Sequence, residues 1–332
     1  MRNFLTIIFI TSLLLLSLEA LSRLFIYISY GDSEAGVKER TVNLSYNPFI
    51  MWGPNFDEDS ANFVINNGVD KEDFVILILG GSTAGEFSKN TIGEGTIENA
   101  FSKFLINNNQ KLYIFNTAVG GFNIRQEISA LMITVEKINP DLIIIIDGAN
   151  DVQHALRPGV IPGTTFVDQT YKTVITKPYL GPMVYLIQRS QFINGLSRLI
   201  NRFNLRKDNF DEHNINKTID LYLESRNFIH KYAKGSEIKT IFMLQPHVVF
   251  SSNISDINAK KRFKYRSSIV KESFNKISNS KYSQEICFVD ANKKIIDENL
   301  SIDFIDDVHF KNNKGYYYMA ELLADTYEKC YE

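Results

Sequence analysis

A serine, a histidine and two neighbouring aspartates in this sequence have the residue types needed for nucleophilic catalysis. Ser82 lies in the stretch "VILILGGSTAGE", and Asp306, Asp307 and His309 lie together in "IDDVHF" near the C-terminus. A serine hydroxyl becomes a good nucleophile only when a base takes its proton, and a histidine does this near neutral pH. A carboxylate beside the histidine orients the imidazole and stabilises its charged form. These residues predict attack by Ser82, with His309 as the base.

Three other interpretations of the glycine-rich turn fit its sequence less well. A phosphate-binding P-loop needs a lysine after its glycines, but Glu86 follows, and a dinucleotide fingerprint needs G-x-G-x-x-G where this chain has G-G-S-T-A-G. The nucleophile elbow of α/β-hydrolases, G-x-S-x-G, is nearly matched. That fold, however, usually places its serine mid-sheet and its acid far from its histidine. On this turn alone, Ser82 could also be a helix N-cap.

Five short apolar runs predict the strands that would position these residues. The runs are continuous rather than alternating, which is typical of strands buried on both faces of a parallel sheet. Between two of them, "IRQEISALMITVEKI" (124–138) places its apolar residues on one helical stripe. This alternation predicts a three-layer, doubly wound, flavodoxin-like α/β fold with about five strands. The predicted strands are residues 74–79, 112–116, 142–147, 240–244 and 286–290.

The candidate residues all follow predicted strands. Ser82 follows the first strand, "NTAVGGFN" (116–123) follows the second, and "GAND" (148–151) follows the third, while Asp306 and His309 come after the last. In an open parallel sheet, a ligand site forms beyond the carboxyl ends of the strands. We therefore expect a serine, glycine-rich backbone, an asparagine and an Asp/His pair to meet on one rim.

These four segments, in this order, resemble the sequence blocks of the SGNH (GDSL-type) hydrolase superfamily. Each block is a weak signal alone, but their order and their places at strand ends make the combination specific. Gly81 stands where many members have an aspartate, a "GGST" form familiar among membrane-anchored bacterial members, and Ala118 stands where a glycine is common. The matching segments are residues 80–82, 116–121, 147–151 and 306–309.

The resemblance implies a role for each matching residue. Ser82 would be the nucleophile, His309 the base, and the D-x-x-H spacing would select Asp306 as the carboxylate. The backbone N–H groups of Ser82 and Gly121 and the side chain of Asn150 would form the oxyanion hole, where one donor is worth about 2.7–4 kcal/mol. Gly121 could instead only permit a tight turn, and Asn150 could only brace a loop. No cofactor is implied, because water and three side chains suffice.

An apolar N-terminal segment predicts a membrane anchor. The uncharged run "FLTIIFITSLLLLSL" (4–18) would span roughly 22 Å as a helix, short of the ~30 Å hydrocarbon core, and continuation to residue 30 supplies the missing length. Glu19 and Arg23 would then pair on one helical face. No small-x-small cleavage site follows, so we expect an uncleaved transmembrane helix over residues 1–30. The flanking positive charges do not fix its orientation.

The remaining chain is predicted to form a tether and one catalytic domain. Residues 31–73 are rich in Gly, Ser, Asn and Asp without periodicity, which is typical of a linker. The domain would cover residues 74–332, with an insertion at about 152–238. Within the insertion, residues 185–203 have helical spacing and are expected to pack on the domain, with a membrane-lying helix or an active-site lid as alternatives.

Composition excludes several classes of function. The apolar and charged fractions, 44% and 22%, are those of an ordinary globular protein, and a net charge of −2 without a basic tract gives no reason to expect nucleic acid. Five scattered histidines make a metal site an unsupported interpretation. Cys287 and Cys330 are too few for a disulfide framework and leave the redox compartment open.

From the resemblance and the N-terminal segment, we expect a membrane-anchored serine esterase. It would be periplasmic or extracellular and would remove a small acyl group, such as acetyl, from a carbohydrate or lipid-linked substrate through an acyl-serine intermediate. The same residues could instead serve an O-acyltransferase acting on a cell-surface polysaccharide. A third reading is a non-catalytic surface or assembly protein built on this fold.

Overall fold

The computed structural model describes most of the chain outside three longer gaps. The described residues are 2–30, 46–47, 51–52, 54–89, 97–105, 110–156, 161–164, 179, 190–193, 195–196, 212–251, 266–298 and 302–332.

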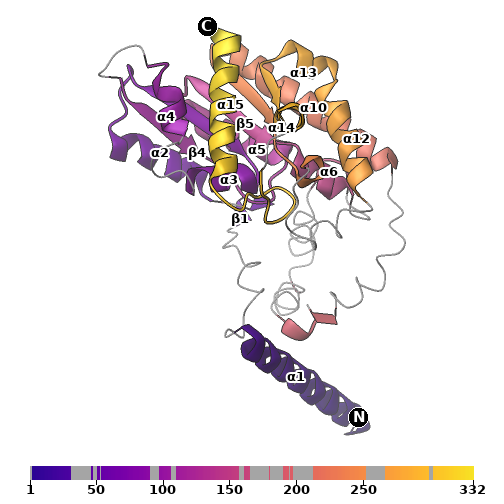
Figure 1. The fold of residues 1–332 in the computed structure, drawn as a ribbon. Helices are drawn as coiled ribbons and strands as arrows, with labels where there is room; N and C mark the ends of the chain where they lie inside the picture. The colour runs from indigo at the N-terminus through magenta and orange to yellow at the C-terminus, as the bar shows by residue number, and fades with distance from the viewer. Residues whose placement is uncertain are drawn as a thin grey trace. The chain divides into compact units, whose positions relative to one another are not determined.

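A five-stranded parallel sheet forms the centre of the fold (Figure 1). The strand order is β4-β3-β5-β6-β7, so the first two strands of this sheet exchange places and the later ones follow in sequence. This is the flavodoxin-like order, and it confirms the predicted doubly wound sheet. The strands are β3 (Phe74–Gly80), β4 (Leu112–Asn116), β5 (Leu142–Asp147), β6 (Lys239–Leu244) and β7 (Phe288–Asp290).

Helices cover both faces of this sheet, as expected for strands that are apolar on both sides. Residues at alternate positions of the three central strands pack with α3, α4, α14 and α15, and the other positions face α5 and α10. The helices on the first face are α3 (Ser82–Lys89), α4 (Ile97–Ser102), α14 (Ala291–Asp297) and α15 (Lys314–Tyr331). The other helices of this unit are α2 (Phe56–Asn67), α5 (Ile124–Ile138), α6 (Ala149–Ala155), α10 (Glu212–Gly235), α12 (Ser267–Ser278) and α13 (Lys281–Glu285).

Part of the predicted tether is a helix that packs on the domain. α2 lies against α5, where the buried Phe56 ring meets Phe122 edge-on with 6.4 Å between the ring centroids. Phe63 contacts Phe115 of β4 at 4.9 Å. The tether prediction for residues 31–73 is therefore wrong over this helix, because contacts with distant segments hold it rather than a local apolar stripe.

The predicted insertion is shorter than the sequence indicated. The prediction covered residues 152–238, but α6 follows β5 directly and α10 is the helix that leads into β6. Both belong to the layered domain, because α10 packs on α5, α6 and β6. The helix predicted over residues 185–203 lies mostly outside the described residues.

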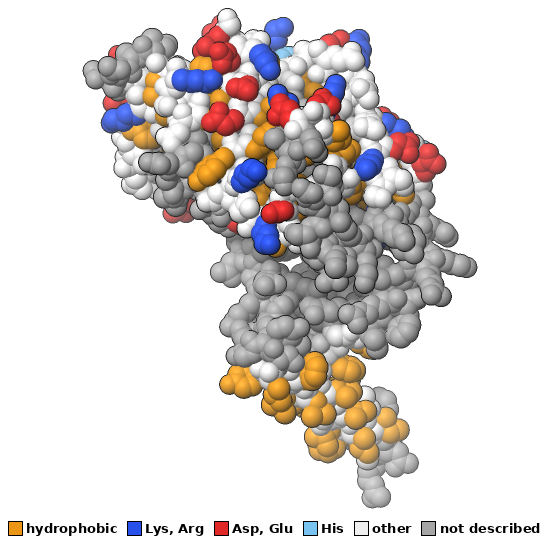
Figure 2. All heavy atoms as spheres, in the orientation of Figure 1, with side chains coloured by type: hydrophobic (Ala, Val, Ile, Leu, Met, Phe, Trp, Pro, Cys, Tyr) orange, Lys and Arg blue, Asp and Glu red, His pale blue; other side chains and the backbone are white. Residues whose placement is uncertain are grey.

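The N-terminal segment belongs to a separate compact unit and forms the predicted helix, α1 (Arg2–Tyr30). Glu19 pairs with Arg23 at 2.8 Å, as expected, and also accepts hydrogen bonds from the Ser190 hydroxyl and two backbone N–H groups. Many apolar side chains of α1 are exposed (Figure 2). Nevertheless, in the part of the chain that the structure describes, no helix meets both the length and the apolarity needed to span a membrane. The predicted transmembrane helix is thus not supported.

The two cysteines form a disulfide, which the sequence alone did not decide. Cys287 precedes β7 and Cys330 lies in α15, and the bond links positions 43 residues apart. A bond across a loop of this size typically stabilises a domain by about 2–4 kcal/mol, largely by restricting the unfolded chain.

We expect Cys330→Ser to lower the free energy of unfolding by about 2–4 kcal/mol, measured by urea denaturation. Wild-type protein unfolded in the presence of a reductant should lose about the same amount. Titration of two free thiols in the unreduced wild-type protein would contradict the bond.

Candidate active site

The predicted site residues lie where the strand order of the sheet reverses. Ser82 begins α3 directly after β3, and Asn150 lies in α6 directly after β5, and these two strands are neighbours. Such a switch point opens a crevice beyond the carboxyl ends of the strands, because the connections leave toward opposite faces. The fold therefore places the nucleophile segment and the asparagine segment side by side.

The segments of Ser82 and His309 are joined through their neighbours. The Thr83 hydroxyl donates to the Val308 carbonyl oxygen at 3.3 Å and accepts from the Gln245 side chain at 3.0 Å. Among the described residues, no hydrogen bond joins the Ser82 hydroxyl to the His309 imidazole. In enzymes without a bound substrate, such bonds are often long and tighten only in the complex.

Asp306 and His309 form the predicted pair. The His309 Nδ1 atom donates to Asp306 Oδ2 at 2.7 Å, and the other carboxylate oxygen accepts from the backbone N–H groups of Val308 and His309, each at 2.9 Å. With Nδ1 as the donor, Nε2 is left to take a proton. The aspartate thus fixes both the tautomer and the orientation of the ring.

The electrostatics of this pair suit a base. Burial by itself lowers the pKa of His309, but the hydrogen bond and charge of Asp306 outweigh it, so the pKa is raised above its ordinary value. Burial by itself raises the pKa of Asp306. Its hydrogen bonds to His309 and to the two backbone N–H groups nevertheless hold its pKa well below the usual range. Asp306 therefore stays ionised next to the imidazole.

Asp307, the neighbouring carboxylate, has different partners. It accepts a hydrogen bond from the Gln153 side chain of α6, and its backbone carbonyl accepts from the Val248 N–H at 2.8 Å. Burial raises the pKa of Asp307. Of the two aspartates left open by the sequence, only Asp306 is hydrogen-bonded to His309.

Side chains of α6 hold the loop that carries Gly121. The Asn150 amide donates to the Phe122 carbonyl at 2.8 Å, Asp151 accepts from the Ile124 N–H at 3.3 Å, and His154 Nε2 donates to the Gly121 carbonyl at 3.2 Å. The Asn150 amide has a second N–H to offer an oxyanion. Because one helix holds both candidate donors, Gly121 and Asn150 are positioned as a unit.

Gly81 explains why this chain has "GGST" at its first block. A Cβ atom at this position would lie 2.3 Å from Asn150 Nδ2, a distance that atoms in proteins do not tolerate. The displaced atom would be the end of a side chain rather than backbone. A larger residue at position 81 would therefore move the Asn150 amide without breaking the sheet.

We expect Gly81→Ala to lower kcat for the predicted ester hydrolysis by about 10²–10³-fold, as removal of one oxyanion donor does, while the protein stays folded. Gly235→Ala is the matched control, since a Cβ there meets no atom within 4 Å. A Gly81→Ala variant with the wild-type kcat would contradict this account of Asn150.

Three further residues could be placed near the sheet rim from the sequence, but their contacts there could not be predicted. Gln245 binds Thr83, and His154 is buried against the Gly121 loop. His247 is buried and accepts a hydrogen bond from the Val249 N–H. Gln245 and His154 follow predicted strands closely, so their positions at the sheet rim were the available signal.

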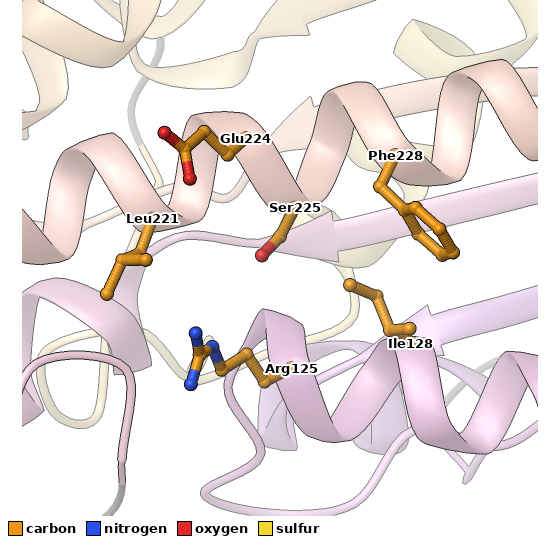
Figure 3. Close-up of a pocket in the computed structure, with 6 residues that line it drawn as sticks. All are labelled: Arg125, Ile128, Leu221, Glu224, Ser225 and Phe228. Atoms are coloured by element: carbon orange, nitrogen blue, oxygen red, sulfur yellow. The ribbon is translucent and has the colours of Figure 1, made fainter.

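A surface pocket of about 370 Å³ lies between α5 and α10 (Figure 3). Arg125 and Ile128 reach into it from α5, and α10 supplies Leu221, Glu224, Ser225 and Phe228. None of the predicted catalytic residues lines it. Among the described residues, no cluster of three or more His, Cys, Asp or Glu side chains could hold a metal ion.

Comparison with known proteins gives similarities at the level of solved structures. No family model and no curated protein matches this chain. A GDSL-like lipase from Bacteroides thetaiotaomicron VPI-5482 is 14% identical, with 83% of this chain and 99% of that chain covered and a TM-score of 0.44. Axe2, an acetylxylan esterase from Geobacillus stearothermophilus solved as a catalytic mutant, is 11% identical, with 76% and 93% covered and a TM-score of 0.42.

Proposed function

We propose that this chain is a serine-dependent ester hydrolase of the SGNH type. The observation that carries the proposal is the 2.7 Å hydrogen bond between Asp306 and His309 Nδ1. The segment of this pair is hydrogen-bonded through the Val308 carbonyl to Thr83, the residue after Ser82. Oriented imidazole, serine and oxyanion donors at one sheet rim are the parts that acyl transfer requires.

The proposed first half-reaction makes an acyl-serine. The Ser82 oxygen attacks the ester carbonyl carbon while His309 Nε2 takes the hydroxyl proton, and Asp306 stabilises the imidazolium. The N–H groups of Ser82 and Gly121 and the Asn150 amide stabilise the negative oxygen of the tetrahedral intermediate. The intermediate then collapses, and the leaving alcohol takes the proton from His309. This step breaks the ester bond and leaves the acyl group on Ser82.

The second half-reaction transfers the acyl group to water. His309 removes a proton from a water molecule, which attacks the acyl carbon, and the released Ser82 oxygen recovers that proton. The products are a carboxylic acid and the regenerated serine. If a sugar hydroxyl entered in place of water, the same residues would perform O-acyl transfer.

The proposed substrate is a small acyl ester, such as an acetyl ester, of a carbohydrate or lipid-linked molecule. The resemblance of the four sequence blocks supports this substrate class. The proposed location is outside the cytoplasm, and the Cys287–Cys330 disulfide supports it because such bonds persist in oxidising compartments.

The proposed function is tested with p-nitrophenyl esters of increasing acyl length and the full-length protein. We expect turnover that is fastest with acetate. Product analysis with an added oligosaccharide separates the two enzyme readings, because a hydrolase releases free acetate and a transferase yields an acetylated sugar. A folded protein that turns over no ester and acylates no acceptor would favour the non-catalytic reading.

A further inference from the structure

Five polar side chains are buried together beneath the segment that carries Asn150. They come from α5, the end of β5, α6 and α10, and none belongs to the catalytic residues proposed above. Each is at most 4% exposed. The cluster consists of Glu127, Asp147, Asp151, Tyr222 and Arg226.

This cluster is costly for a purely structural core. The Arg226 guanidinium lies 4.7 Å from the rings of both Phe242 and Phe288, and its nitrogens have no hydrogen-bond partner among the described residues. Glu127 is buried beside Asp147 and Asp151, and burial together with the charges of these two carboxylates raises its pKa well above the ordinary value. Taking an ion out of water costs several kcal/mol unless excellent partners replace the water. Apolar residues of similar volume would often stabilise such a core equally well, so the cluster calls for a role beyond packing.

Tyr222 connects this cluster to the backbone next to Asn150. Its hydroxyl donates to Asp147 Oδ1 at 2.5 Å. The next residue, Gly148, has a φ of 101°, and a Cβ there would lie 3.4 Å from the Tyr222 hydroxyl oxygen and 2.5 Å from Leu244 Cδ1. Tyr222 and Leu244 therefore pack directly against the Gly148 turn that leads into α6.

The cluster also reaches the other side of Asn150. Asp151 accepts from the Ile124 N–H, at the start of α5 and next to the loop that carries Gly121. Asn150 is thus held between two members of the cluster, Asp147 and Asp151. Its own side chain is fixed by the Phe122 carbonyl.

We propose that Tyr222 is a positioning residue for the oxyanion donor Asn150, acting through Asp147 and the Gly148 turn. This inference rests on the proposed esterase function and adds a residue of α10 to it. The Tyr222 hydroxyl, through its hydrogen bond to Asp147, holds the Asp147–Gly148 turn in the position that lets the Asn150 amide reach the oxyanion. Without this hydroxyl the Gly148 turn relaxes and the Asn150 amide is misplaced. The transition state then loses a stabilising interaction that the bound substrate does not make, so kcat falls.

The test compares two tyrosine-to-phenylalanine variants of the full-length protein. Tyr222→Phe should lower kcat for p-nitrophenyl acetate about 10–100-fold with little change in KM, because a misplacement of about 1 Å can cost 10²-fold. Tyr327→Phe is the matched control. Tyr327 is also buried, and its hydroxyl accepts from Lys239, at the opposite end of β6 from the site. Its kcat should stay within about twofold of wild type.

A second measurement separates positioning from general stability. In an Asn150→Ala background, adding Tyr222→Phe should change kcat by less than about twofold, because Tyr222 then has no donor to position. An equal loss in both backgrounds would overturn the inference, as would a Tyr222→Phe variant with the kcat of Tyr327→Phe. If Tyr222→Phe does not fold, Asp147→Ala removes the other partner of the bond and is subject to the same two comparisons.

Failure of this inference is distinguishable from failure of the proposed function. A wild-type protein that hydrolyses the ester, beside an unaffected Tyr222→Phe variant, would overturn the inference alone. A folded wild-type protein with neither hydrolysis nor covalent labelling of Ser82 would overturn both.

Discussion

Ser82→Ala is expected to lower kcat for ester hydrolysis by about 10⁴–10⁶-fold, to the level set by substrate binding and the oxyanion donors alone. The variant has no oxygen to form the acyl-enzyme, while the Asp306–His309 pair and the α6 contacts do not involve the lost hydroxyl. Initial rates with p-nitrophenyl acetate measure the effect. Wild-type melting behaviour would show that the loss is chemical.

Ser102→Ala is the matched control for this variant. Ser102 ends α4, and its hydroxyl donates to the Asn99 carbonyl in the same helix. Its removal should leave kcat unchanged. If Ser82→Ala kept more than about a tenth of wild-type activity, Ser82 would not be the nucleophile, and another residue would have to be sought.

Asp306→Asn is expected to lower kcat by about 10⁴-fold, because an amide in place of the carboxylate favours the wrong tautomer of His309. The aspartate accepts from His309 Nδ1 at 2.7 Å, whereas an asparagine can present its NH₂ group to that nitrogen. Nε2 then carries the proton and cannot act as the base.

The same variant is expected to shift the pH dependence of kcat/KM. Only the neutral imidazole is a base, so activity falls as the pH drops through the pKa of His309. Asp306 raises that pKa, so the acidic limb of wild-type enzyme should lie above the ordinary histidine value. In Asp306→Asn the residual activity should extend to lower pH. Rates measured from about pH 4 to about pH 9 cover the acidic limb of both the wild-type protein and the variant.

Asp307→Asn separates the two neighbouring aspartates. Asp307 is hydrogen-bonded to Gln153 and has no hydrogen bond to His309 among the described residues, so its loss should be far smaller than that of Asp306→Asn. Equal losses in the two variants would show that the pair has been assigned to the wrong residue.

The sheet was predictable from local sequence because its strands are continuous apolar runs. Residues 112–116 and 142–147 form strands with the predicted bounds, and the helix at residues 124–138 also begins and ends as predicted. That helix has a local start signal, since Asn123 and Gln126 cap each other's backbone N–H groups. Helix α2 has acidic residues in its first turn and Gly68 at its C-cap, but no side-chain hydrogen bond at its N-cap, and rings from β4 and the Gly121 loop pack against it.

The candidate site was predictable as far as residue types and strand ends reveal it. Ser82, Asn150 and the Asp306–His309 pair could be found because each follows a recognisable strand or block. The support beneath them could not. Tyr222 and Arg226 have the spacing of any two residues on one helical face, and both are far from Asp147 in the sequence. The folded structure brings these two residues next to Asp147. Their burial is a property of the tertiary structure, so a single sequence carries no signal for it.

Covalent labelling tests the central claim most directly. Full-length protein is treated with a fluorophosphonate probe and analysed by intact mass and peptide mapping, beside Ser82→Ala and His309→Ala. The account predicts one adduct, located on Ser82, that is absent from Ser82→Ala and strongly slowed in His309→Ala. A folded wild-type protein that forms no adduct, or forms it on another residue, would contradict an activated serine at this position.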